Sequence, residues 1–331
     1  MRAVFRKIHL WLSLPLGLLI SVICLTGAVL VFEQDMTRAL QRGLYTVTPP
    51  SEEAQPLSPS RLAALLDSQV ADTLHLISLR LSDDPHEAAF ASFRETGRKQ
   101  LGINPYTGEV KGWTRTFPFF QTVRKIHRWM MDPPPSKGQG SAGKTIVGVT
   151  TLAMVAILVS GLFIWIPRTR KALKNRLKIS VSKGWHRFWY DSHAATGFYC
   201  TVFLLVMALT GLTWSFGWYR TAAYSLFGAG METSGRSDAP GEGNRPEEAV
   251  LQKVNRPYVV TFDPETGSVV GVVPYSERQR PQTLKGWFYA FHTGSWGGMV
   301  TKVLYFLAAL LGGILPLSGY WLWWKRIHGN R

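Results

Sequence analysis

Four long apolar stretches constrain the fold of this chain more than any other feature. They run approximately over Leu10–Phe32, Thr145–Ile166, Ala194–Phe216 and Val300–Trp324. Each is long enough to cross the hydrocarbon core of a bilayer, which takes about 20 apolar residues. None contains Asp or Glu in its interior. The sequence therefore predicts a mainly α, multi-pass membrane protein with four transmembrane helices.

The first stretch follows the basic start "MRAVFRK", as in a secretory signal peptide. Its apolar run is too long for a signal peptide, however, and no A-x-A-like cleavage site follows it. We therefore expect a retained membrane helix.

The net charge of +16 is distributed very unevenly. Fourteen basic residues and a single acidic one, Asp191, lie before the first stretch, between the second and third, and after the fourth. The two long loops, 33–144 and 217–299, are nearly neutral. By the positive-inside rule, both termini and the short basic loop are predicted to be cytoplasmic and the long loops to be outside. The basic charge thus indicates contact with membrane lipid and no binding of nucleic acid.

Internal repeats divide the chain into two similar halves, each with the order span, outer loop, span. Every span contains a small hydroxyl residue followed by glycine: Thr26-Gly27, Ser160-Gly161, Thr210-Gly211 and Ser318-Gly319. The loops share P-x-T-G-x-V-x-G, in "INPYTGEVKG" and "FDPETGSVVG", which is typical of a turn between two strands.

Around these turns each loop predicts a small α+β domain. The first has a helix in "SPSRLAALLDSQV", capped by Ser58, and strands in "LHLISLRL" and "EAAFASFR". The second is shorter, with a helix near "PEEAVLQKV" and strands in "PYVVTFDP" and "SVVGVVPY". Between them, "SGRSDAPGEGNRP" is predicted to be a loop.

Four histidines recur as two pairs, in register for His9 and His193 and more loosely for His127 and His292, which precede their Ser-Gly motifs by 33 and 26 residues. His9 precedes Thr26 by 17 residues, and His193 precedes Thr210 by the same 17. At about 1.5 Å per residue, each histidine lies at the cytoplasmic end of its span, about 26 Å from the glycine at the other end. His127 and His292 form a second pair, each in an aromatic run between an outer domain and the next span. Two imidazoles facing each other in an apolar site suit non-covalent haem.

Other interpretations of these residues remain open. A lone histidine at the membrane edge is more often structural than a ligand. His186, two turns before His193, is an alternative ligand, a residue for proton or electron entry, or a headgroup-level residue. Zinc would need further ligands, and the nearby carboxylates are only Asp191 and Asp132. The glycines either let a flat macrocycle approach the backbone or let helices pack closely. Cys24 and Cys200 are predicted to be packing residues.

With these motifs, the chain resembles the PepSY-associated transmembrane family of bacterial inner-membrane proteins. The resemblance is carried by "IHLWLSLPLGLLISVICLTGAVLVFE", "KIHRWM", "VSGLFIWIPR", "DSHAATGFY", "FHTGSWGG", "LSGYWLWW" and the doubled turns. It implies two b-type haems, with iron bound by His9 and His193 and by His127 and His292. It also implies reduction of Fe(III)-siderophores in the periplasm.

The resemblance implies an internal two-fold repeat of four transmembrane helices with two small α+β periplasmic PepSY-like insertions. The predicted divisions are transmembrane helix 1 (1–33), PepSY-like domain 1 (34–126), a histidine segment with helix 2 (127–167), the basic cytoplasmic loop (168–187), helix 3 (188–216), a shortened PepSY-like domain 2 (217–286), and a histidine segment with helix 4 and a cytoplasmic tail (287–331).

The expected activity is therefore that of a ferric-siderophore reductase in the bacterial inner membrane. Electrons from a cytoplasmic or quinol donor cross the membrane, and reduction releases Fe(II) in the periplasm. Arg124, Lys125, Arg128 and Lys285 are candidates to attract an anionic chelate. Two alternatives are a haem-bearing relay subunit for a partner reductase and a cofactor-free binding or regulatory membrane protein.

Overall fold

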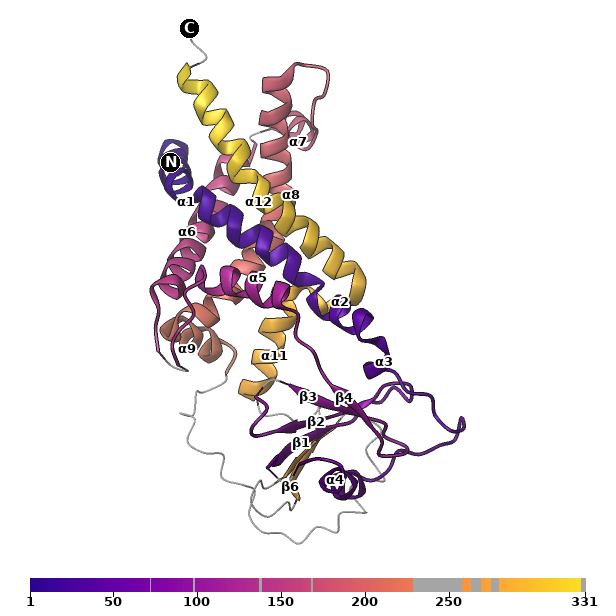
Figure 1. Cartoon of the computed structure of the whole chain (residues 1–331). Helices are drawn as coiled ribbons and strands as arrows, with labels where there is room; N and C mark the ends of the chain where they lie inside the picture. Colours follow the sequence, from indigo (N-terminus) through magenta and orange to yellow (C-terminus); the bar gives the residue numbers. More distant parts are fainter. Residues whose placement is uncertain are drawn as a thin grey trace. The chain divides into compact units, whose positions relative to one another are not determined.

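The computed structural model describes residues 1–71, 73–97, 99–136, 139–167, 169–228, 258–262, 269–274 and 280–328. The chain folds into two compact units (Figure 1). The membrane unit comprises 1–33, 118–231 and 284–331, and the sheet unit comprises 34–117 and 232–283. Each unit is therefore assembled from segments that are distant in the sequence.

Four long helices confirm the four predicted spans. They are α1 (Arg2–Val31), α6 (Ala142–Trp165), α8 (Trp185–Ser215) and α12 (Gly298–His328), and each is long and apolar enough to cross a membrane. The helices α1, α8 and α12 extend beyond the apolar stretches and include the basic and aromatic residues at their ends. The chain is thus a mainly helical, multi-pass membrane protein.

The four spans pack in the cyclic order α1, α6, α8, α12. The equivalent first helices of the two halves, α1 and α8, therefore lie diagonally opposite each other. The core between the spans is formed by side chains from all four of them: Ile20, Cys24, Met154, Ile157, Cys200, Leu204 and Ala308. Both cysteines are buried and unbonded in this core, which agrees with their expected packing role.

Shorter helices precede or follow the spans in the sequence. They are α2 (Glu33–Leu40), α5 (Pro118–Trp129), α7 (Arg170–Arg176), α9 (Gly217–Leu226), α11 (Arg280–Thr293) and the 3-10 turn η2 (Ser295–Gly297). Of these, α5 packs against α1 and α6. The helix α7 lies in the basic loop between α6 and α8, where buried Asp191 accepts hydrogen bonds from the Arg187 side chain and the Ser180 backbone. The single acidic residue of the basic segments thus anchors that loop.

The sheet unit contains one six-stranded antiparallel sheet in the order β4-β3-β2-β1-β5-β6. The first long loop supplies α3 (Arg42–Tyr45), α4 (Pro59–Asp67), β1 (Leu76–Arg80), β2 (Ala89–Phe93), β3 (Gln100–Ile103) and β4 (Val110–Trp113). The second supplies β5 (Tyr258–Phe262) and β6 (Val269–Pro274). The predicted cap is present, since the Ser58 hydroxyl accepts from the Arg61 backbone at 3.4 Å.

The two loops join in one sheet, a pairing that the sequence analysis did not predict. Strand β5 pairs with β1, and the fully buried Leu79 and Val260 lie opposite each other. A hairpin of two strands is only marginally stable alone, whereas added to the edge of β1 it buries Val260 and Phe262 in the core of the first segment. The shortened second segment is therefore completed by the first.

Only some of the predicted loop features can be compared with the structure. In the first turn the Gly108 backbone donates to the Asn104 carbonyl at 2.9 Å, and Gly108 has a φ of +76°, which favours glycine. The second turn, the helix near "PEEAVLQKV" and the loop "SGRSDAPGEGNRP" lie outside the described residues.

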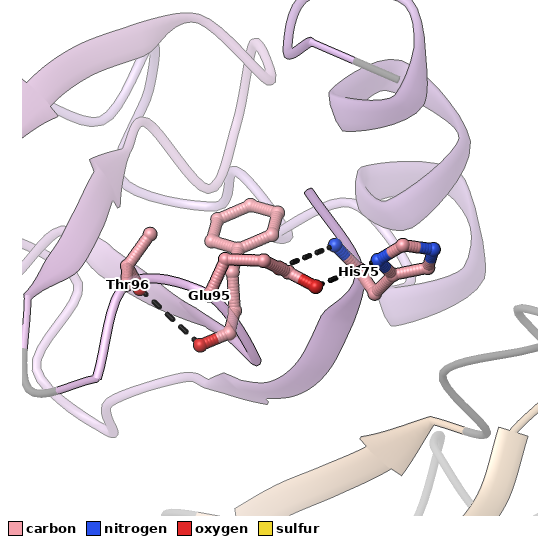
Figure 2. A network of polar contacts seen from close by, with 4 residues as sticks. His75, Glu95 and Thr96 are labelled. Atoms are coloured by element: carbon pink, nitrogen blue, oxygen red, sulfur yellow. Dashed lines mark hydrogen bonds and ion pairs between the residues drawn. The ribbon is translucent and has the colours of Figure 1, made fainter. Parts of the chain in front are cut away.

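Figure 2 shows how the ends of two neighbouring strands are joined by an ion pair. Just before β1, the His75 backbone and its Nδ1 contact the two Glu95 carboxylate oxygens at 2.9 and 2.7 Å. The backbone hydrogen bond from His75 is the main reason that the pKa of Glu95 lies below its usual value. His75 is thus a surface residue with a structural partner.

Candidate haem-binding histidine pairs

The first histidine pair joins the two diagonal spans. His9 on α1 and His193 on α8 have ring centres 6.4 Å apart, and the ring planes are nearly perpendicular, at 88°. The helices α1 and α8 both pack mainly against α6 and α12. Because the two rings meet between these diagonal helices, they lie inside the bundle. We call His9 and His193 the span pair.

The second pair comes from the flanking helices. His127 on α5 and His292 on α11 have ring centres 6.2 Å apart and an interplanar angle of 54°. The Trp214 ring contacts His292 edge-on, at 5.2 Å between ring centres. We call His127 and His292 the flank pair. In both pairs, one imidazole comes from each half of the chain.

The ring of each of the four histidines packs against one of the four repeated hydroxyl–glycine motifs. A Cβ added to Gly161 would lie 3.1 Å from His9 Cε1, and one added to Gly27 would lie 3.0 Å from His127 Cε1. The corresponding distances are 3.1 Å from Gly211 to His292 and 3.5 Å from Gly319 to His193. These glycines therefore make room for an imidazole, a role that differs from both roles considered from the sequence.

The hydroxyl of each motif lies beside Nδ1 of the same histidine. The distances are 3.5 Å for Ser160 and His9, 3.2 Å for Thr26 and His127, 2.8 Å for Ser318 and His193, and 3.1 Å for Thr210 and His292. We call each hydroxyl–glycine motif, with its histidine in place, a histidine seat. The four seats are equivalent by the internal repeat.

Backbone carbonyls complete three of the seats. His9 Nδ1 lies 3.0 Å from the Ile157 carbonyl, His127 Nδ1 2.9 Å from that of Ile23, and His292 Nδ1 2.8 Å from that of Met207. An Nδ1–H donated to a carbonyl selects the tautomer in which Nε2 carries a lone pair. Among the described residues, all hydrogen bonds of the four rings involve Nδ1, so each Nε2 is available to bind a metal.

This arrangement fits a bis-histidine haem. Metal–imidazole bonds are about 2.0–2.1 Å, so two nitrogens on opposite sides of one metal lie about 4 Å apart and their ring centres about 6 Å apart. Ligating histidines also commonly donate their second nitrogen to a carbonyl or a carboxylate. The ring-centre distances of 6.4 and 6.2 Å agree with the first condition, and His9, His127 and His292 each have a carbonyl beside Nδ1. The described residues contain no group of three His, Cys, Asp or Glu side chains suited to a simple metal ion.

A cavity of about 380 Å³ surrounds the flank pair. This volume is within the range of about 300–1,000 Å³ typical of ligand pockets. Both histidines and both of their seat glycines line it, and most of the wall is apolar, including Val147, Met154, Leu204, Met207 and Ala208. Burial lowers the pKa of both His127 and His292 to about 4, so these rings are neutral near pH 7.

One side of this cavity is ionic. Arg124 forms an ion pair with Glu33, and Arg128 lies over the Trp129 ring at 4.7 Å. Both arginines and Glu33 line the cavity. The proposed attraction of an anionic chelate to Arg124 must therefore be weakened by the neighbouring carboxylate.

His186 is placed differently from the four paired histidines. It is exposed, and its ring centre lies 5.8 Å from that of Trp321. The neighbouring Trp189 also contacts Trp321, at 6.1 Å. His186 is therefore part of an aromatic cluster at the start of α8, which supports the surface interpretation over that of a ligand.

The fold and these sites define a multi-pass membrane protein built from two related halves that meet at two histidine pairs. The comparison with protein families is specific: residues 6–326 match the PepSY-associated TM region. The chain belongs to this family, as its motifs had indicated. No curated protein matches the chain.

Several site features were not identified from the sequence. The hydroxyl–glycine repeat was visible, but its contact with Nδ1 requires knowledge of which span faces which histidine. Two buried indole nitrogens, Trp165 Nε1 and Trp189 Nε1, have no hydrogen-bond partner among the described residues. Trp165 lies one turn beyond Gly161 and Trp189 one turn before His193, so a polar group bound beside the span pair would be within their neighbourhood.

Proposed function

We propose that this protein binds two b-type haems and transfers electrons across the bacterial inner membrane to periplasmic Fe(III)-siderophores. The observation that carries this proposal is the pair of cross-repeat imidazole contacts, at 6.4 and 6.2 Å, each with Nδ1 held by its seat. Such a seat is typical of a histidine prepared to bind metal through Nε2.

In this proposal His9 and His193 bind one haem iron, and His127 and His292 bind the other. Haem, when bound, supplies an iron that alternates between Fe(III) and Fe(II), so two sites at different depths provide a route for electrons. The seats orient the imidazoles through Nδ1. The wall around the flank pair is mostly apolar, and Trp165 and Trp189 offer N–H donors beside the span pair.

The reaction needs no acid or base from the protein. One electron, supplied by a quinol or a cytoplasmic reductant, converts the bound Fe(III) of the chelate to Fe(II). The siderophore ligands, which are hard oxygen donors, hold Fe(II) more weakly, and the iron is released. With the basic segments cytoplasmic, both termini face the donor and the sheet unit faces the periplasm.

The optical spectrum of the purified full-length protein in detergent tests this proposal. We expect a six-coordinate b-type spectrum on reduction with dithionite, at two haems per chain, and reoxidation by a ferric siderophore with no partner protein. His9→Ala and His127→Ala should each reduce the haem content from two to one. His186→Ala is the matched control and should retain both.

A colourless protein, or full haem content in both the His9→Ala and His127→Ala variants, would contradict the proposal. A protein with two haems that is not reoxidised by a ferric chelate would instead act as a relay subunit for a partner reductase. Haem content and chelate reduction are therefore measured separately.

A further inference from the structure

The sheet unit contains a large groove beside its edge strand β4. Its volume is about 760 Å³, and its wall is formed by α3, by the residues on either side of it, and by β4 and the segment that follows. In the described sheet, β4 pairs only with β3. The groove therefore lies wholly within one compact unit, and its lining residues differ from those that hold the two histidine pairs.

The charge of this groove is of one sign. Arg42, Lys99, Lys111 and Arg115 line it, and none of the described residues that line it is acidic. The side chains of Arg42, Lys99 and Arg115 are exposed and form no hydrogen bond or ion pair with described residues. Since the surrounding loop is nearly neutral overall, these cations are a local concentration of charge. A cleft lined by one sign of charge raises the local concentration of oppositely charged ligands.

The wall of the groove is also held rigidly. The Gln41 side chain forms two hydrogen bonds with the Arg115 backbone, accepting at 2.7 Å and donating at 3.0 Å. Lys111 Nζ donates to the Thr46 carbonyl at 2.8 Å, so its position is fixed. A site whose charged groups are already oriented loses less entropy when it binds a ligand. These contacts fix the backbone wall of the groove and one of its four cations, Lys111.

The groove offers an aromatic surface as well as cations. Trp113, at the end of β4, is 36% exposed and packs against Phe93 with ring centres 5.6 Å apart. Ring surface beside several guanidinium and ammonium groups suits a ligand with carboxylates or catecholates on a compact frame. A chelate carrying net negative charge has these properties.

We propose that this groove is a binding site for anionic ferric chelates, with carboxylate or catecholate donors, in preference to neutral or cationic ones. The inference rests on the proposed function, because it assigns a charge class and a docking site to the siderophore substrate. The groove captures the chelate on the sheet unit and so raises its concentration at the protein.

Binding of gallium(III) citrate to the full-length protein in detergent tests this inference. Ga(III) replaces Fe(III) in an anionic chelate but is not reduced, so binding is measured without electron transfer. Equilibrium dialysis should give saturable binding to the wild-type protein that weakens as the salt concentration rises. A neutral gallium tris-hydroxamate should bind at least tenfold more weakly, on the order of one lost charge-assisted contact.

The variant Arg42→Gln/Arg115→Gln removes two of the exposed cations that line the groove. It should raise the Kd for gallium citrate by at least about tenfold, because charge-assisted hydrogen bonds contribute more than neutral ones. The control Arg61→Gln/Arg94→Gln removes the same charge from exposed positions of the same unit that do not line the groove. It should change Kd by less than about twofold, the size of a surface effect.

Equal weakening in both variants would overturn the inference, because it would show only a general attraction to a basic protein. Absence of gallium citrate binding, or equal binding of the neutral chelate, would overturn it too. None of these results depends on haem. A protein with two haems that fails these binding tests refutes only the groove, and a colourless protein that passes them refutes only the haem proposal.

Discussion

The two halves of the chain are nearly equivalent in the membrane unit and very unequal in the sheet unit. In the membrane unit, each half supplies two histidine seats and one imidazole to each pair. In the described part of the sheet unit, the first half supplies four strands and the second supplies two. A site between two equivalent helices needs the same parts from both sides. A sheet needs only that each exposed edge be paired or protected, so one half can lose strands.

This comparison predicts that the stability of the sheet depends most strongly on the pairing of β1 with β5, where the two halves meet. Leu79→Ala should destabilise the sheet by about 2–5 kcal/mol, as buried leucine truncations do, and should loosen both β1 and β5. Amide hydrogen exchange in the full-length protein measures this. The neighbouring Ile77 is 36% exposed, and Ile77→Ala is the control, with an expected effect below about 1 kcal/mol. If β5 kept its protection in Leu79→Ala, the two halves would not share one core.

The four seats are similar but differ in space, which gives a second test. Gly27→Ala should push His127 aside, because the new Cβ would lie 3.0 Å from Cε1, at a typical overpacking penalty of about 1–3 kcal/mol. Gly319→Ala should be tolerated, since 3.5 Å is ordinary contact. Haem content and its spectrum in detergent measure the difference. Equal loss in both variants would show that the glycines serve helix packing and not the imidazoles.

A smaller effect is expected from the seat hydroxyls of the span pair. Ser318 lies 2.8 Å from His193 Nδ1, whereas Ser160 lies 3.5 Å from His9 Nδ1, which has the Ile157 carbonyl at 3.0 Å. Ser318→Ala should therefore reduce stability by about 0.5–1.5 kcal/mol, and Ser160→Ala by less. Thermal unfolding of the two variants measures this. The reverse order would mean that the halves hold their imidazoles by different contacts.

The smallest predicted effect concerns the surface pair of the first half. The pKa of Glu95 is lowered mainly by the His75 backbone, so its contribution to stability is present above the unfolded pKa and is lost as the pH falls through the folded one. Because the backbone donor remains, His75→Ala should leave the pKa of Glu95 low. An NMR titration of the Glu95 carboxyl carbon would detect this. A return to the ordinary value would assign the shift to the imidazole.

Much of the membrane unit could be predicted from the sequence because hydropathy and the repeated motifs can be recognised within single segments of the chain. The four spans, the register of His9 with His193 and the depth of the glycines all follow from spacing along single helices. The joining of β5 to β1 could not be predicted, because pairing between segments about 180 residues apart leaves no local signal. The basic groove was missed for a similar reason, since Arg42, Lys99 and Arg115 meet only after the sheet has formed.

The cyclic order of the spans has a consequence for how such a protein can be assembled. Because α1 and α8 lie diagonally opposite each other in the bundle, neither half alone contains both histidines of a pair. Each half therefore holds one imidazole in its seat, and the pair forms when the two halves pack together. Insertion of the last helix, α12, supplies the seat of His193. If the span pair binds haem as proposed, stable binding there is therefore expected only after α12 has been inserted, and chains that lack α12 should stay free of haem at that position.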